Sequence, residues 1–196
     1  FGLYYLSCCW KVTTTPMRAA KFAWWGFLTL LIIASLLYPI AAAWSKTDGF
    51  SQNPTLDGLA FIEVTNPAER GAISWLNSNV EGAPVIVEAT GDDYTQYGRV
   101  SECTGIPTLL GWGGHELQWR GPGPDLRNRE RDIDLIYQSE DVERVQALLK
   151  NYNVIYVYVG PLEKLKYGEG SLKKFSSFMD VCFSNEEVTI YKVKVG

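Results

Sequence analysis

The sequence has little of what the common metal and nucleotide sites require. It contains one histidine, His115, and four cysteines with no Cys-x-x-Cys pair, which excludes structural zinc sites of the Cys/His kind. It has no P-loop, and the glycines at 111–114 do not complete a dinucleotide fingerprint, because Glu116 stands where the third glycine belongs. It also has no Gly-x-Ser-x-Gly nucleophile motif. Nucleotide enzymes and serine hydrolases of these types are therefore excluded.

Acidic residues are absent from the first 45 positions, which carry only the bases Lys11, Arg18 and Lys21. Residues 46–196 carry all 22 acids against 15 bases. A domain with this excess of negative charge repels phosphate, so no nucleic-acid partner is expected. The chain therefore consists of two unlike parts.

The first part contains a long uncharged run, residues 22–45. Its 24 residues would span roughly 36 Å as a helix, which exceeds the hydrocarbon core of about 30 Å. Aromatic residues flank both ends, with Trp24 and Trp25 at one and Trp44 at the other, as membrane interfaces favour. We predict a transmembrane helix over 22–45. A cleaved signal peptide is the alternative, since Ala41 and Ala43 offer small residues for a cleavage site.

Three bases in residues 11–21 predict the orientation of this helix. The positive-inside rule places this loop in the cytoplasm and residues 46–196 outside the cell membrane, with 46–60 as a linker. The apolar run 1–10 precedes the loop, and we interpret it as the end of an earlier transmembrane helix of a multi-pass protein. The lipid bilayer and the rest of such a membrane bundle are then the expected partners.

Residues 61–196 have the pattern of an α/β domain. Asn66, Pro67 and Glu69 form a helix start with a capping box, and apolar residues follow at helical spacing up to Gly82. Apolar runs predict strands at 84–87 and 154–159, and a helix capped by Ser139 lies between them. A short helix is expected over 172–178 and an antiparallel pair over 181–184 and 188–193. We predict a Rossmann-like three-layer domain with a parallel core and an antiparallel edge.

The segment from Glu88 to Pro124 is the candidate binding site, since it follows the carboxyl end of a predicted parallel strand, where ligands of α/β sheets bind. It combines glycines and aromatic rings with acids and bases, which suits a sugar: rings pack on its apolar faces while polar groups bind its hydroxyls. Alternatively, Trp112 and Trp119 are core anchors and the glycines only make turns. The candidate substrate-binding residues are Asp92, Asp93, Tyr94, Tyr97, Arg99, Trp112, His115, Glu116, Trp119 and Arg120.

Other chemistry in this segment is less well supported by the pattern. Asp92, Asp93 and Glu116 offer oxygen ligands for a divalent cation, although adjacent acids commonly mark a solvated turn. His115 offers a base for Cys103, but no nucleophile motif surrounds either residue. Cys103 and Cys182 are a candidate disulfide in an external domain. No cofactor is expected in these 196 residues, and a divalent cation in a longer protein stays open.

Several strings resemble the C-terminal end of the Chlor_Arch_YYY family of large multi-span membrane proteins from green non-sulfur bacteria and archaea. They are TLDGLA at 55–60, AISWLN at 72–77, PVIVEA at 84–89, YGRVS at 97–101, TGIPT at 104–108, GW at 111–112, HELQWRG at 115–121 and YVYVGPLE at 156–163. The resemblance covers nearly the whole chain. The block that begins at Gly111 is its most specific part.

That family looks like a relative of membrane glycosyltransferases that use polyprenyl-phosphate sugars, a likeness at the level of fold. The resemblance implies a catalytic acid in a membrane bundle upstream of Phe1, so none of these residues is assigned a catalytic role. It also implies that Arg99 and Arg120 meet phosphate or carboxylate charge, while rings stack on sugar. Two alternatives are open: a non-catalytic, membrane-anchored module that binds glycan or protein, and a soluble domain released by signal cleavage.

Overall fold

The computed structural model describes residues 14–50, 55–121 and 124–194. The chain divides into two compact units, residues 1–56 and residues 57–196, which are described separately below. The division falls close to the predicted start of the α/β domain at residue 61. The prediction of a membrane segment at 1–10 lies outside the described residues.

The first unit contains one helix, α2 (Thr15–Lys46), among its described residues. It begins seven residues before the predicted span, so the predicted loop 11–21 is helical from Thr15 onward. Pro16 occupies the first turn, where its missing N–H costs nothing. Within the apolar stretch, the Ser35 hydroxyl donates to the carbonyl oxygen of Ile32 at 2.8 Å and is thereby satisfied without water. By length and composition, α2 is apolar enough to cross a membrane.

The second unit is built on a mixed sheet in the order β1-β2-β4-β3. Its strands are β1 (Val85–Val87), β2 (Val154–Val159), β3 (Met179–Ser184) and β4 (Thr189–Val193). Strands β1 and β2 are parallel, whereas β4 is antiparallel to both β2 and β3. The α/β class and the terminal antiparallel pair are confirmed. The parallel core is smaller than predicted, because it consists of one strand pair and a single bridge between Ile86 and Thr108.

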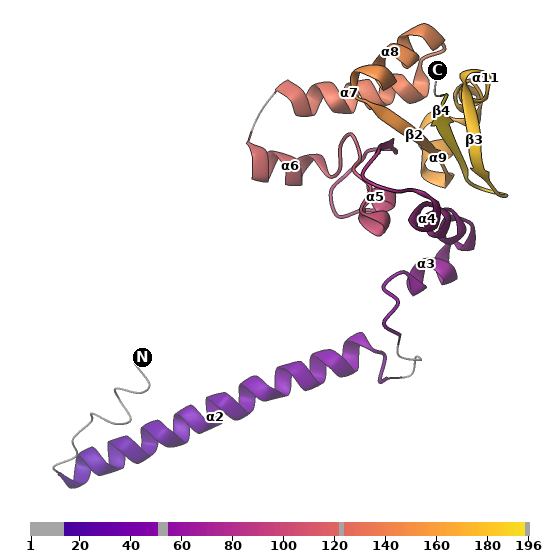
Figure 1. The fold of residues 1–196 in the computed structure, drawn as a ribbon. Helices are drawn as coiled ribbons and strands as arrows, with labels where there is room; N and C mark the ends of the chain where they lie inside the picture. The colour runs from indigo at the N-terminus through magenta and orange to yellow at the C-terminus, as the bar shows by residue number, and fades with distance from the viewer. Residues whose placement is uncertain (1–13, 51–54, 122–123, 195–196) are drawn as a thin grey trace. The chain divides into compact units, whose positions relative to one another are not determined.

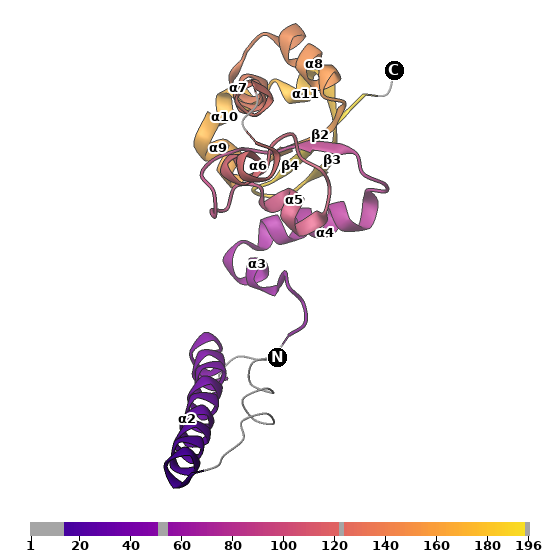
Figure 2. The same cartoon turned by 90° about the vertical axis from the view of Figure 1, so that its left-hand side faces the viewer.

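Helices cover both faces of this sheet, as the two views of Figures 1 and 2 show. On one side lie α4 (Pro67–Asn79) and α5 (Arg99–Thr104). On the other lie α7 (Pro124–Gln138) and α8 (Val142–Asn151). The remaining helices are α3 (Ala60–Thr65), α6 (Gly113–Arg120), α9 (Pro161–Tyr167), α10 (Glu169–Leu172) and α11 (Phe175–Phe178). The predicted three layers are therefore present.

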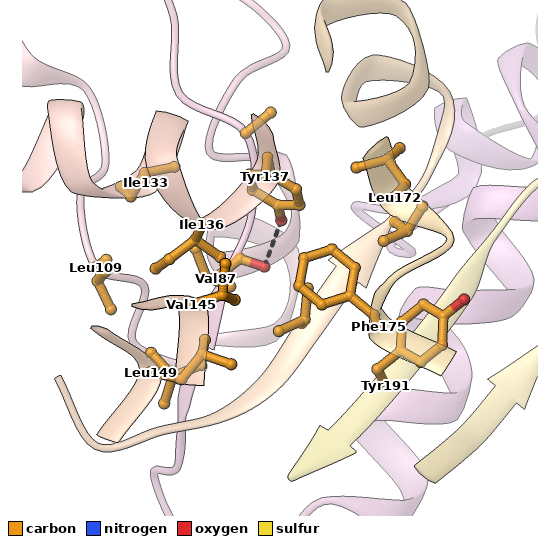
Figure 3. Packing of buried hydrophobic residues seen from close by; sticks show 14 of the residues in the cluster. Val87, Leu109, Ile133, Ile136, Tyr137, Val145, Leu149, Leu172, Phe175 and Tyr191 are labelled. Carbon is orange, nitrogen blue, oxygen red and sulfur yellow. Dashed lines mark hydrogen bonds between the residues drawn. The ribbon is translucent and has the colours of Figure 1, made fainter. Parts of the chain in front are cut away.

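The core between the sheet and α7 is centred on aromatic side chains (Figure 3). Phe175 is fully buried, with its ring centroid 6.0 Å from that of Tyr137 and 5.7 Å from that of Tyr191. The Tyr137 hydroxyl lies 2.9 Å from the carbonyl oxygen of Val87 and 2.8 Å from that of Tyr158. Because these oxygens belong to β1 and β2, the single O–H of Tyr137 is placed to donate to either strand near its carboxyl end.

The opposite core packs α4 and α5 against the same strands. Ala72 and Leu76, four residues apart on α4, are fully buried with Ile86 of β1 and Val100 of α5. This helix begins as the sequence predicts, because the Asn66 side chain accepts from the Glu69 N–H at 2.9 Å. It ends at Asn79, before the predicted stop at Gly82.

The helices near the carboxyl end of the chain and in the linker differ from the predictions. The expected helix over 172–178 is two separate turns, α10 and α11. The segment 46–60 was expected to be a linker throughout, but α3 begins at Ala60. Helices of four to seven residues have at most two turns, which is too short for a repeated helical pattern of apolar residues to be recognised in the sequence.

The start of α8 also corrects a prediction. Asp141, not Ser139, is its N-cap residue: the Asp141 carboxylate accepts from the Arg144 N–H at 3.0 Å. Ser139 acts one step earlier, where its hydroxyl accepts from the Asp141 N–H at 3.2 Å.

This difference gives a direct test. We expect Asp141→Ala to lower the free energy of unfolding by about 1 kcal/mol. The Arg144 N–H loses its acceptor, and a negative charge that the helix dipole favours is removed. Ser139→Ala should cost less. Urea titration of the full chain in detergent micelles measures both, with Glu140→Ala as an exposed acidic control. A larger loss of unfolding free energy for Ser139→Ala than for Asp141→Ala would show that Ser139 is the N-cap residue.

Candidate functional site

The candidate segment between β1 and α7 is more ordered than a glycine-rich loop. It contains α5 and α6, which sequence analysis did not predict. Gly98 and Gly105 bracket α5 with φ of 82° and 73°, a left-handed conformation that favours glycine. The glycines therefore delimit a short helix as well as making turns.

Three rings gather on this segment: Tyr94, Trp112 and His115, called the ring cluster below. The centroid of Tyr94 lies 5.2 Å from that of Trp112 and 4.7 Å from that of His115. Trp112 and His115 meet edge to face at 5.2 Å. The Trp112 indole N–H donates to the carbonyl oxygen of Tyr97 at 2.6 Å, which fixes the indole relative to the start of the segment. The structure thus brings three of the predicted side chains together, whereas the Tyr97 ring packs against the hydrophobic core.

Tyr94 has an unusual backbone conformation for an aromatic residue, with φ of 58°. Its side chain nevertheless remains 76% exposed. Strained residues of this kind persist where the surroundings hold them, and they concentrate at functional sites. Tyr94 therefore presents an exposed ring from a backbone conformation that few aromatic residues adopt.

Two of the predicted acids hold the segment together. Asp93 accepts from the Gly114 N–H at 3.0 Å, and Glu116 accepts from the Gly111 N–H at 3.1 Å. A side chain at position 114 would collide with the Asp93 carboxylate, so glycine is required for this approach. Among the described residues, no group of three His, Cys, Asp or Glu side chains is placed to hold a metal ion. The cation site considered for Asp92, Asp93 and Glu116 is thus not formed.

Trp119 and Arg120 lie on the outer surface of α6. Trp119 is 82% exposed, so it is not a core anchor. Arg120 pairs with Glu116 one turn earlier, with 3.1 Å between its Nη1 and the carboxylate Oε2. The Arg120 side chain is 66% exposed, whereas that of Glu116 is 19% exposed, so the pair lies at the surface with Arg120 on its outer side.

Arg99 is not available in that way, which corrects its predicted role. Its side chain is buried, donates through Nε to Glu69 at 2.6 Å, and pairs through Nη2 with both Glu69 and Glu163. Burial disfavours the charged guanidinium, but the two carboxylates outweigh it and raise the pKa of Arg99. Arg99 therefore joins α4, α5 and α9 from within.

Glu88 is a further buried acid next to these residues. We call Glu69, Glu88, Arg99 and Glu163 the buried charge network. Glu163 accepts from the N–H groups of Ala89 and Gly160, at 2.8 and 2.9 Å, and so links the residues that follow β1 and β2. Glu88 accepts from the N–H groups of Val100 and Ser101 at the start of α5, both at 2.9 Å. Burial raises the pKa of the Glu88 carboxyl, and these two hydrogen bonds oppose that rise.

Sequence reasoning missed this network. Its members are separated by up to 94 positions, from Glu69 to Glu163, and a charge in the sequence carries no sign of burial. The sequence contained one signal. Gly160 is followed by Pro161, and Glu163 comes three residues after Gly160, which is the spacing of a capping glutamate at a helix start. The network is connected to the candidate segment through Arg99, which is the first residue of α5.

A cleft of about 360 Å³ opens beside Trp112. It is lined by the indole, by the backbone of Gly98 and Gly111, and by Ser101 and Glu102 of α5. Neither Ser101 nor Glu102 was predicted as a site residue. An indole next to a hydroxyl and an exposed carboxylate offers both surfaces that a sugar needs, an apolar face and hydrogen-bonding groups.

The predicted disulfide is not formed, because Cys103 and Cys182 are both free thiols. Cys103 is the last residue but one of the short helix α5. Cys182 lies on β3, and its thiol donates to the carbonyl oxygen of Ile190 at 3.3 Å. Burial raises the pKa of both thiols.

No family model matches the chain, so the resemblance to the Chlor_Arch_YYY family stays a prediction. No curated protein matches it either. Among solved structures, it is similar to the C-terminal globular domain of an oligosaccharyltransferase from Archaeoglobus fulgidus. The match has 12% identity and a TM-score of 0.44, and it covers 73% of this chain and all of that domain.

Proposed function

We propose that this chain belongs to a membrane glycosyltransferase that uses a lipid-linked sugar, and that residues 91–121 help to hold its substrate. The observation that carries the proposal is the ring cluster, with Tyr94 largely exposed and the Trp112 cleft beside it. Aromatic faces next to carboxylates and a hydroxyl are the chemistry of sugar binding. The apolar helix α2 supports a membrane location.

In this proposal the exposed face of α6 provides the second part of the binding surface. The Trp119 indole would stack on a sugar or lie along the lipid chain, and Arg120 would bind the phosphate that joins them. The same proposal includes three further parts. Residues 46–196 lie outside the cell membrane, α2 is oriented accordingly, and the catalytic acid lies elsewhere in a longer protein.

The test is to replace Trp119 and Arg120 together with alanine in the full chain in detergent micelles. Binding of a short-chain polyprenyl-phosphate hexose is followed by saturation-transfer NMR. We expect affinity to fall by about tenfold or more, since a stacking contact and a charge-assisted hydrogen bond are lost together. The unfolding midpoint should not change, because both side chains are exposed.

Arg131→Ala is the matched control, because its side chain is 67% exposed, against 66% for Arg120, and it lies on α7 away from the ring cluster. It should bind as the wild type does. Unchanged binding by the double variant would show that the exposed face of α6 does not contact the lipid-linked sugar. Binding of free glycans without the lipid phosphate would favour the alternative of an anchored glycan-binding module.

A further inference from the structure

A second pocket lies at the amino end of β2, whereas the candidate segment follows the carboxyl end of β1. Its walls come from α8, from the turn that joins α8 to β2, from α11 and from the end of β4. Figures 1 and 2 both show α8 and α11 at the same end of the domain. The volume is about 540 Å³, within the range of roughly 300–1,000 Å³ that small-molecule sites have. We call it the basic pocket.

Apolar side chains form most of the wall of the basic pocket. Leu149 of α8 and Val154 of β2 are each 3% exposed and belong to the core shown in Figure 3, where Leu149 is labelled. Phe178 and Val193 are partly buried and pack against the same core. The pocket therefore reaches the edge of the core, and an apolar body placed in it would remove carbon surface from water.

Two lysines, Lys150 and Lys194, also line the pocket, and none of the described residues in its wall is an acid. This contrasts with residues 46–196 as a whole, which carry 22 acids against 15 bases. Asp180 lies outside the wall, with its Oδ1 3.9 Å from the Nζ of Lys194. Two bases against one neighbouring acid leave one positive charge, which complements a ligand with a single negative charge.

The fold accounts for only one of these lysines. Lys150 is in the last turn of α8, where a cation offsets the helix dipole. The dipole does not explain Lys194, which directly follows β4 and reaches the same pocket from a distant part of the sequence. The amides of Gln146 and Asn153 add neutral N–H donors to the wall. The polar groups of this apolar pocket are thus those that a carboxylate requires as donors.

We propose that the basic pocket binds a small organic monoanion, a single carboxylate on a compact apolar body. The carboxylate oxygens accept from the ammonium groups of Lys150 and Lys194, while the body packs against Leu149, Phe178 and Val193. A ligand with an ammonium group is repelled by the same lysines, and a neutral molecule gains the apolar contact alone. The inference does not depend on the proposed transferase function, because none of these residues lies in the candidate segment.

The probe is 4-benzoylbenzoate, which carries one carboxylate on an apolar body, and 4-benzoylbenzamide is its neutral counterpart. Saturation-transfer NMR titration of the full chain in detergent micelles gives the dissociation constant of each, with empty micelles as the blank. We expect the carboxylate to bind at least about tenfold more tightly than the amide, since its negative charge strengthens the hydrogen bonds to both ammonium groups. Irradiation then attaches the probe covalently through its ketone, and peptide mass spectrometry should locate it on α8, α11 or the end of β4.

The two lysines are tested by Lys150→Gln and Lys194→Gln combined in one chain. Both side chains are exposed, so the unfolding midpoint should stay close to that of the wild type. The dissociation constant of 4-benzoylbenzoate should rise by about tenfold or more, whereas that of the amide should not change. Lys173→Gln is the matched control, because Lys173 is also exposed but does not line the basic pocket. It should bind both probes as the wild type does.

Three results would overturn the proposal. Equal affinity for the carboxylate and the amide would show that the pocket is purely apolar in its selectivity. Unchanged affinity in the double variant would show that the lysines do not contact the ligand. Absent binding, or attachment outside α8, α11 and the end of β4, would show that the pocket is not a site for this class of ligand. Failure of the lipid-linked sugar to bind has no bearing on this result, because 4-benzoylbenzoate contains neither sugar nor phosphate.

Discussion

Replacing Arg99 with methionine is expected to lower the free energy of unfolding by about 3–5 kcal/mol. The guanidinium is the partner of two buried carboxylates, Glu69 and Glu163, and its removal leaves both without a counter-charge. Methionine fills much of the same volume, so the loss reports on charge more than on packing. Urea unfolding of the full chain in detergent micelles, followed by tryptophan fluorescence, measures the change.

Arg131→Met is the control for this prediction. Arg131 also pairs with an acid, Asp132, but its side chain is 67% exposed, so the expected loss is below about 1 kcal/mol. If the two variants lost the same stability, the buried charge network would not hold the domain together. A large loss for Arg99→Met alone would show that Arg99 stabilises the fold.

Phe175→Ala should have an effect of similar size through packing alone. The ring is fully buried between Tyr137 and Tyr191, and its deletion leaves a cavity that costs about 3–5 kcal/mol (Figure 3). The same urea titration measures the loss. Leu165→Ala, at a position that is 81% exposed on α9, should change stability by less than about 0.5 kcal/mol. A loss below 1 kcal/mol for Phe175→Ala would show that this core repacks around the gap.

Local patterns allowed the main elements to be predicted. Residues 154–159 alternate large apolar and aromatic side chains without a break, and they form β2 with the predicted bounds. The Asn66 cap gave the start of α4 because it depends only on residues within one turn. The reciprocal half of the predicted capping box is not formed, because the Glu69 carboxylate accepts from Arg99 instead. In both cases the determining contacts are close in sequence.

The candidate site was predicted less completely because its geometry depends on distant residues. The approach of Tyr94, Trp112 and His115 requires Asp93 to reach Gly114, a contact between positions 21 residues apart. Arg99 is held in a buried position by Glu69 and Glu163, which are 30 and 64 residues away in the sequence. The family resemblance implied that Arg99 meets phosphate or carboxylate charge of a substrate, whereas the structure buries Arg99 between Glu69 and Glu163.

The last strand in the sequence, β4, lies inside the sheet, between β2 and β3. Among the described elements, synthesis therefore produces α2 before the sheet, and β4, which lies between β2 and β3, after the other three strands. Pairing of β1 with β2 must also wait until residue 154 has been made, since Val85 pairs with Val154. Long-range pairing of this kind is slow compared with the local β3–β4 hairpin. A chain that stops before Thr189 would contain α2 but leave β2 with an unpaired edge, so the completeness of translation decides whether the domain can fold.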